Sequence, residues 1–310
     1  MKKHKVLQMR KSLFLFVLFW GFSLVACTAT GDSEDMSPSG SNDSGSGANS
    51  GKSGNNEPVN NVGSSSSADD PQEAEGLSDL VNMVKIPAMS FTRGTAVFSV
   101  DAYSISKTEV TQGLYRKVMG AVAKDDSLGD DYPIFNVSWY DAALFCNALS
   151  KKVGYDTAYV YDSVNSGGEL INLSINYAVQ SVRLPTELEW EIAARAGTTT
   201  TYYWDTDDAY KYAYYAQRKG PVAVAGLVPN DAGLYDMAGN VAEWVNDWFY
   251  AYPTVSQDNY AGPEEGDYKV VRGGGWSDKA PALASGEREK KVPKHRSQTI
   301  GFRIVYSMGI

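Results

Sequence analysis

The sequence predicts an α+β domain with short helices, and three observations support this prediction. Two segments, 83–91 and 98–105, are predicted as strands on either side of a turn at 93–95. Three further segments show helical patterns that each stop at a glycine after a few turns. A last segment, Gly233–Trp248, mixes polar oxygens, glycines and tryptophans too closely for an amphipathic helix.

The first predicted helix, 111–119, stops at Gly120 and follows an acid, Glu109. The helix macrodipole favours an acid near a helix N-terminus, so we expect a structural role for Glu109. The second helix begins after Ser138, with Asp141 at its third position, an arrangement close to a capping box. It ends near Gly154.

The third helix has the sharpest signals. Thr186 and Glu189 make a full capping box, and the helical pattern runs to a stop at Gly197. Glu187, Glu189 and Glu191 could be interpreted as general acids. The structural interpretation is stronger, because the first two complement the helix dipole and Glu191 can pair with Arg195 four residues later.

The segment Gly233–Trp248 contains four side chains that offer oxygen atoms, which are Asp236, Asn240, Glu243 and Asp247. Glycines in the same segment permit backbone turns that other residues resist. The indoles of Trp244 and Trp248 each need a hydrogen-bond acceptor if they are buried. We therefore expect a rigid loop held by polar contacts beneath the core.

Six segments of this sequence resemble motifs of the formylglycine-generating enzyme (sulfatase-modifying factor) superfamily, in the family's order. They are Lys107-Thr-Glu-Val-Thr111, Asn136-Val-Ser-Trp-Tyr-Asp-Ala142, Arg183-Leu-Pro-Thr-Glu-Leu-Glu-Trp-Glu191, Gly233-Leu-Tyr-Asp-Met-Ala-Gly-Asn-Val-Ala-Glu-Trp244, Val271-Arg-Gly-Gly-Gly-Trp276 and Gly301-Phe-Arg303. The resemblance covers residues 80–310. It implies a single irregular α+β domain that is related to the C-type lectin fold, with little regular sheet.

Members of this family that make formylglycine use a pair of cysteines to bind copper, and soft thiolates are the ligands that Cu(I) selects. The resemblance places Asp278 and Leu283 where those cysteines would fall. The chain has only two cysteines, Cys27 and Cys146, and Cys146 is expected to be a buried small hydrophobe within the second helix. A catalytic copper site is therefore not expected.

Histidine is equally scarce. Iron-dependent sulfoxide synthases also resemble this domain, but they need three histidines, and this chain has only His4 and His295. A Ser/His/Asp site would have to use His295, which lies in a strongly charged run that is simpler to explain as a solvated loop.

The resemblance also implies a structural calcium site. Its ligands would be the side chains of Asp236 and Glu243 and the carbonyls of Gly239 and Val241, which give calcium part of the oxygen shell it prefers. A second family calcium site needs an acid where this chain has Ala225, so that site is doubtful. Ala242 stands where family members usually have a tryptophan, and this difference is expected to widen the central groove.

The charge of the chain argues against two kinds of partner, nucleic acid and anionic membrane surfaces. The formal net charge is −9, and residues 1–26 are basic, so the rest of the chain is more acidic still. Nucleic acid and anionic membrane surfaces are therefore not expected to attract the domain.

Residues 1–26 have a basic start and a short apolar run that ends in Leu24-Val-Ala-Cys27, as export signals do. The last four residues resemble a bacterial lipobox, so Cys27 is expected to be acylated and to attach the chain to a lipid bilayer. An ordinary secretory signal and a signal anchor are the alternatives. The expected location is the bacterial cell envelope, lipid-anchored and extracytoplasmic, at the outer membrane or cell surface.

Residues 27–79 are dominated by Ser, Gly, Asn and acids, and they lack the apolar residues needed for a core. This segment is predicted as an extended tether. Residues 198–215, in contrast, are rich in Thr and Tyr. Their rings form either a stacking surface for a sugar or peptide, or an apolar cover over a domain with few regular elements.

Three functions are therefore considered for the protein. The favoured one is a membrane-anchored binding or scaffolding module for a protein or glycan ligand, which uses an oxidase fold without its cysteines. The groove of this module would include Arg272, Trp276, Asp278 and Arg303. The second is an enzyme that uses Asp278, Arg272 and Arg303 in the same groove. The third is a purely structural envelope lipoprotein.

Overall fold

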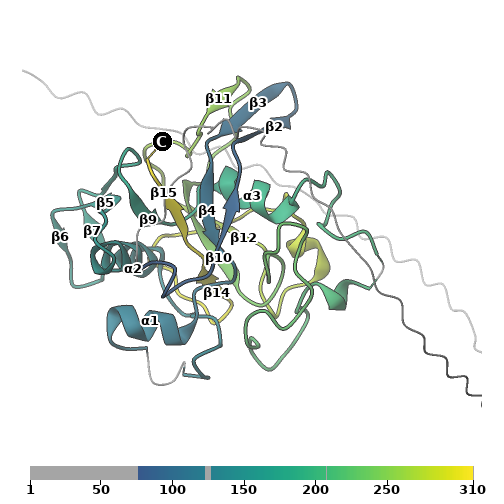
Figure 1. The fold of residues 1–310 in the computed structure, drawn as a ribbon, viewed down its shortest axis with the longest axis horizontal. Coiled ribbons are helices and arrows are strands. Elements are labelled where there is room, and N and C mark those ends of the chain that lie inside the picture. The colour runs from purple at the N-terminus through teal and green to yellow at the C-terminus, as the bar shows by residue number, and fades with distance from the viewer. Residues whose placement is uncertain (1–75, 123–126, 207, 310) are drawn as a thin grey trace, which may run out of the picture. The chain divides into compact units, whose positions relative to one another are not determined.

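The structure is a computed structural model that describes residues 76–122, 127–206 and 208–309 (Figure 1). The described residues belong to one unit, Ser65–Ile310. The predicted export signal, the acylated Cys27 and almost all of the predicted tether lie outside the described residues. The described residues form a mixed α/β fold with three α-helices and several small sheets, as the sequence predicts.

The two predicted strands each divide in two. The first gives β1 (Met83–Ile86) and β2 (Met89–Arg93), and the second gives β3 (Ala96–Val100) and β4 (Tyr103–Ser106). The turn between β2 and β3 lies at 94–95, as predicted, and β2 pairs with β3 while β1 pairs with β4. The inner strands, β2 and β3, and the outer strands, β1 and β4, therefore belong to different sheets. The sequence has no signal strong enough to predict the break between β1 and β2 or the break between β3 and β4.

The three helices begin as their caps predict. Helix α1 (Gln112–Met119) is capped by Thr111, α2 (Trp139–Lys152) by Ser138 with both halves of the capping box present, and α3 (Glu187–Arg195) by Thr186 with Glu189. Helix α3 ends one residue earlier than predicted, because its left-handed C-cap is already Ala196, with φ of 46°, and Gly197 follows with φ of 90°.

The remaining elements are β5 (Tyr159–Val160), β6 (Ser163–Val164), β7 (Leu170–Ile171), β8 (Ser174–Ile175), β9 (Ser181–Arg183), η2 (Ala209–Lys211), β10 (Ala242–Trp248), β11 (Gln257–Asp258), β12 (Lys269–Arg272), η3 (Ala280–Leu283), β13 (Glu289–Lys291), β14 (Ile300–Phe302) and β15 (Val305–Ser307). Among the described residues, the strands form two four-stranded sheets, a three-stranded sheet and two two-stranded sheets, β5-β8 and β6-β7. The first sheet has the order β1-β4-β15-β9, the second β13-β12-β10-β14, and the third β11-β3-β2.

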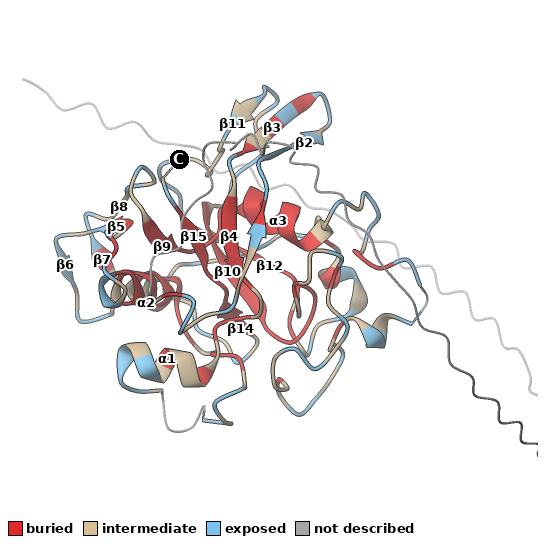
Figure 2. Ribbon diagram, viewed as in Figure 1, coloured by how far each residue is buried: buried red, intermediate tan, exposed pale blue. Residues whose placement is uncertain are grey.

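Strand β10 is an inner strand of the second sheet, paired antiparallel with β12 and parallel with β14. The second half of the predicted rigid loop is therefore a buried strand. Its successive side chains point to opposite faces of the sheet. Trp244 packs into the apolar cluster around α2, and Val245 packs into the cluster around α3. The same strand thus joins the two halves of the core, and Figure 2 shows burial concentrated on β10, α2 and α3.

Leu77 extends the folded part of the chain by three residues beyond the predicted start at Leu80. Its side chain is fully buried in the cluster around α2. Within 76–122, 127–206 and 208–309, no helix has the length and apolar character that crossing a bilayer requires.

A chain that begins at Gly76 is expected to melt at the same temperature as one that begins at Thr28, whereas a chain that begins at Leu80 melts lower. The physical reason is that the last chain lacks Leu77. In the full chain, Leu77→Ala is expected to lower the free energy of unfolding by about 2–5 kcal/mol. Denaturant unfolding measures this change.

The control is Leu128→Ala, since Leu128 is 49% exposed and its loss should change the stability by less than about 0.5 kcal/mol. A lower melting temperature for the chain that begins at Gly76 would contradict the prediction, because residues 28–75 would then contribute to folding.

Candidate functional site

The loop before β10 makes turns that need particular residues. Gly239 has φ of 82°, and a Cβ atom there would lie 2.4 Å from the carbonyl oxygen of Tyr214. Asn240 also has positive φ, and it connects three segments. Its N–H donates to the Tyr214 carbonyl at 2.8 Å, its side-chain oxygen accepts from the Val222 N–H at 3.0 Å, and its carbonyl accepts from the Trp276 N–H at 2.7 Å. The loop is therefore fixed to the segments at Tyr214, Val222 and Trp276.

Glu243 on β10 forms a buried ion pair with Arg303, which lies between β14 and β15. The two N–O distances are 2.7 and 2.8 Å, and each residue is at most 1% exposed. The Trp190 indole donates to the same carboxylate at 2.6 Å. Arg303 also donates to the carbonyls of Ser106 and Tyr235. Both oxygens of Glu243 are therefore occupied by donors from within the protein.

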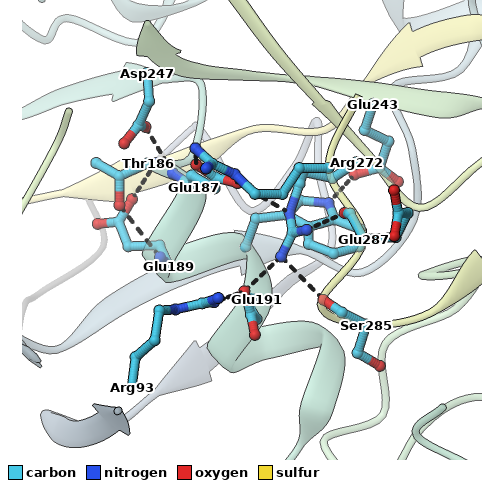
Figure 3. A network of polar contacts seen from close by, with 12 residues as sticks. Arg93, Thr186, Glu187, Glu189, Glu191, Glu243, Asp247, Arg272, Ser285 and Glu287 are labelled. Atoms are coloured by element: carbon cyan, nitrogen blue, oxygen red, sulfur yellow. Dashed lines mark hydrogen bonds and ion pairs between the residues drawn. The ribbon is translucent and has the colours of Figure 1, made fainter. Parts of the chain in front are cut away.

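The acids of α3 are buried in a second network of charges (Figure 3). Glu191 accepts from Arg272 at 2.6 Å, from Arg195 at 2.9 Å and from Arg93. Glu187 accepts two hydrogen bonds from Arg288. The predicted Glu191–Arg195 pair is present, but the cations from distant segments were not predictable from the helix sequence. These contacts support the structural interpretation of the acids.

The predicted groove residues do not all meet. A cavity of about 350 Å³ is lined by Arg272 and Asp278, but Trp276 and Arg303 are not among its lining residues. Arg272 is 1% exposed and donates to Glu191 and to the carbonyls of Ser285 and Glu287. Arg272 and Arg303 therefore both tie loops to the core.

The two positions that the resemblance aligns with the copper-binding cysteines lie in different environments. Asp278 lines this cavity, and its carboxylate accepts from the Gly275 N–H at 2.8 Å, which closes the turn between them. Leu283 is 2% exposed and packs in the cluster around α3. Ala242 is also among the residues that line the cavity, where the family usually has a tryptophan.

The predicted calcium ligands are only partly suited to an ion. Asp236 accepts from the Ala225 N–H at 2.7 Å and lies near Glu109, whose second oxygen is buried without a hydrogen-bond partner. Burial raises the pKa of both carboxyls, and the charge of Asp236 raises that of Glu109 further. These oxygens suit a hard cation. Glu243 does not, because Arg303 and Trp190 hold its carboxylate.

Across the described ranges, no group of three or more His, Cys, Asp and Glu side chains converges as a metal cluster. The calcium site therefore stays a prediction, and the donor set favours Asp236 over Glu243 as its side-chain ligand.

Lys269 on β12 is a buried cation that the sequence analysis did not single out. Its ammonium lies 4.0 Å from the ring centre of Trp139 and 3.8 Å from that of Trp248, and it donates to the Asn246 carbonyl at 2.8 Å. Burial lowers the pKa of Lys269 to about 7, although the nearby Asp247 carboxylate opposes this shift. No local signal marks such a site, because its two rings come from α2 and β10.

The aromatic loop at 198–215 stacks its own rings against one another. Trp204 lies between Tyr202 and Tyr212, with ring centres 4.8 and 5.8 Å away and nearly parallel planes. Trp204 is only 8% exposed, so this ring serves mainly as packing. The hydroxyl of Tyr202 donates to the Ala280 carbonyl and fixes the loop beside η3.

The described residues fold as a domain of the kind found in the formylglycine-generating enzyme family. The model of the sulfatase-modifying factor enzyme 1-like domain family matches residues 67–308, and the chain belongs to this family. The solved structure of Treponema denticola variable protein 1 is 33% identical to the chain with a TM-score of 0.65, and the match covers 72% of this chain and 94% of that one.

Curated relatives match over shorter regions. The serine/threonine-protein kinase pkn1 of Chlamydia pneumoniae is 38% identical over 125 residues, which is 39% of this chain and 20% of the kinase. The formylglycine-generating enzyme of Mus musculus is 27% identical over 193 residues, 56% of this chain and 44% of that enzyme. The inactive Cα-formylglycine-generating enzyme 2 of Bos taurus is 29% identical over 198 residues, 58% of this chain and 52% of that protein. The chain thus spans about half or less of these relatives.

Glu243→Gln is expected to lower the free energy of unfolding by about 3–5 kcal/mol, because it leaves the buried charge of Arg303 without its partner. Denaturant unfolding in chelator and in calcium measures this loss, and the ion pair predicts the same loss in both. Glu289→Gln is the control, since Glu289 lies exposed on β13.

A loss that appears only in calcium would contradict the ion-pair argument and would make Glu243 a calcium ligand. If Asp236 binds calcium, the ion should raise the melting temperature of the unmodified chain, because it binds only the folded state. Asp236→Asn should then remove most of that increase.

Proposed function

We propose that this protein is a lipid-anchored, extracytoplasmic binding or scaffolding module that does not perform copper-dependent formylglycine formation. The observation that supports this proposal most directly is the supply of thiols. The resemblance to this family implies that formylglycine formation needs copper held by two thiolates. The sequence has one cysteine besides Cys27. A single thiol cannot form the ligand pair that the reaction needs.

Cys146 is also badly placed for catalysis. It lies inside α2, its side chain is fully buried, and burial raises the pKa of its thiol well above the usual range. The thiolate is the form that binds metals, so a buried, protonated thiol is inert. Asp278 and Leu283 supply a carboxylate and an apolar side chain instead of the aligned cysteines, and neither is a soft ligand.

The matched relatives are consistent with a domain that has more than one use. Regions similar to this chain occur in proteins named as a kinase, a formylglycine-generating enzyme and an inactive form of that enzyme. A shared fold does not fix a shared activity. The alternative of an enzyme built on Arg272 and Arg303 receives no support from their contacts, because both guanidinium groups are engaged by buried carboxylates.

The anchoring part of the proposal rests on the N-terminal sequence. The basic and apolar residues before Cys27 are those of an exported lipoprotein, and the acidic, Ser- and Gly-rich segment that follows is long enough to hold the domain away from a bilayer. Acylation of Cys27 with more than one chain would anchor the protein stably. The expected partners are a bilayer and a protein or glycan ligand.

The copper-loaded chain is expected to leave a cysteine-containing sulfatase-type peptide unchanged, because it cannot assemble a thiolate pair. Mass spectrometry of the peptide detects the aldehyde product. A formylglycine-generating enzyme run in parallel is the positive control. Aldehyde formation that persists in Cys146→Ala would overturn the proposal and would point to the cavity beside Asp278.

Cys27→Ser is expected to release the protein from the membrane fraction and to abolish fatty-acid labelling, since the acyl chains would have no attachment atom. Cell fractionation and labelling with a fatty-acid analogue measure both effects. Cys146→Ser is the matched control, and it should keep the label. Unchanged labelling of Cys27→Ser would show that the anchor is not at this residue.

A further inference from the structure

One cavity of the described domain lies away from the predicted groove. It has a volume of about 670 Å³, and its lining comes from the β7–β8 segment, the end of β10 and the loop at 261–265. Pockets that hold small ligands typically have volumes of roughly 300–1,000 Å³. None of the residues assigned above to calcium, copper or the predicted groove lines this cavity.

The wall at 261–265 is held rigidly against β10. Gly262 has φ of 82°, and a Cβ atom there would lie 3.0 Å from the Asp247 Cβ. A Cβ atom on Gly266 would lie 3.1 Å from that of Trp248. The Trp248 indole donates to the Glu264 carbonyl at 3.1 Å. The cavity therefore has a preformed wall, which limits the entropy lost when a ligand binds.

The floor presents one hydrogen-bond donor whose direction is fixed by a chain of contacts. The Tyr159 hydroxyl accepts from the Leu184 N–H, so its own proton goes to the side-chain oxygen of Asn246 at 3.1 Å. The Asn246 amide nitrogen then donates to the Tyr177 hydroxyl at 2.8 Å. No hydrogen bond among the described residues uses the Tyr177 proton, and burial raises the pKa of Tyr177, so that proton stays in place.

The cavity also offers apolar surface and hydrogen-bond acceptors. Its apolar lining includes Tyr140, Leu173, Ile175, Trp248 and Pro263. The acceptors are the side chains of Glu264 and Glu265, which are both exposed and have no ion-pair partner in the described part of the chain. The hydroxyl of Ser174 can donate or accept. A suitable ligand therefore has an apolar face and several groups that both donate and accept.

The charges around the cavity disfavour an anion. An anion would meet Glu264 and Glu265 at the wall, in a chain of net charge −9. A simple cation or a purely apolar ligand would leave the Tyr177 proton without an acceptor, which costs binding free energy.

We propose that this cavity binds a neutral saccharide of one or two rings. The apolar face of the sugar ring would lie against the aromatic and aliphatic lining, a hydroxyl would accept from Tyr177, and other hydroxyls would donate to Glu264 and Glu265. The inference rests on the proposed function as a binding module, and it names the class of ligand. It requires neither calcium nor the predicted groove.

The test titrates the full chain with glucose, galactose, mannose, N-acetylglucosamine, lactose and cellobiose, using calorimetry in chelator. At least one of these probes is expected to bind with a dissociation constant of about 10 mM or tighter. Glucuronate carries the ring of glucose with a negative charge. If glucose binds, glucuronate is expected to bind about tenfold more weakly, because it meets the like charges of Glu264 and Glu265.

Two variants place the binding in this cavity. Tyr177→Phe is expected to weaken binding about tenfold, because it removes the hydrogen bond that the Tyr177 hydroxyl would donate to the ligand. Glu264→Gln should weaken it about threefold or more while leaving folding intact, since Glu264 is exposed. The matched controls are Tyr210→Phe and Glu289→Gln, which change exposed residues outside this cavity and should bind as the unmodified chain does.

Failure of all six neutral sugars to bind would overturn the proposal, as would binding that both variants leave unchanged. Tighter binding of glucuronate than of glucose would also overturn it, since the ligand would then be an anion. None of these outcomes bears on formylglycine formation, which the peptide assay tests separately. Failure of the saccharide proposal is therefore distinguishable from failure of the proposed function.

Discussion

The buried ion pair of Glu243 and Arg303 is the interaction on which the rest of the domain depends. One guanidinium joins β10, the end of β4 at Ser106 and the loop at Tyr235. Removing two charges from water costs several kcal/mol per ion, and only a well-satisfied geometry offsets that cost. The Trp190 indole completes this geometry and brings in α3. The pair thus selects one arrangement of segments that lie far apart in the sequence.

The acids of α3 extend the same principle. A surface helix would place its carboxylates in water, yet Glu187, Glu189 and Glu191 are all at most 3% exposed. They remain buried because cations from other segments reach them, and Arg183 alone makes two hydrogen bonds of 2.7 Å to Glu189 (Figure 3 shows the neighbouring acids). The helix is therefore not amphipathic in the ordinary sense. Loss of Arg183 would leave the buried charge of Glu189 without its cation.

Local interactions were predictable from the sequence, and long-range partners were not. The caps at Ser138 and Thr186 involve residues three positions apart, and both appear as predicted. The contact of Arg93 with Glu191 spans 98 residues, and no local pattern indicates it. The strand β10 was missed because its glycine- and acid-rich start resembles a loop, while its pairing with β12 and β14 is a tertiary contact. The cage around Lys269 was missed for the same reason.

The family motifs stabilise the fold without depending on the aligned cysteine positions. Glu243, Arg303, Trp190 and Arg272 form the buried networks, and their partners are other motif residues or backbone carbonyls. Asp278 closes a local turn, and Leu283 packs as an ordinary apolar side chain. The charge networks therefore do not involve the side chains at these two positions. Folding and the chemistry at these positions depend on different side chains, and a shared fold does not fix a shared activity.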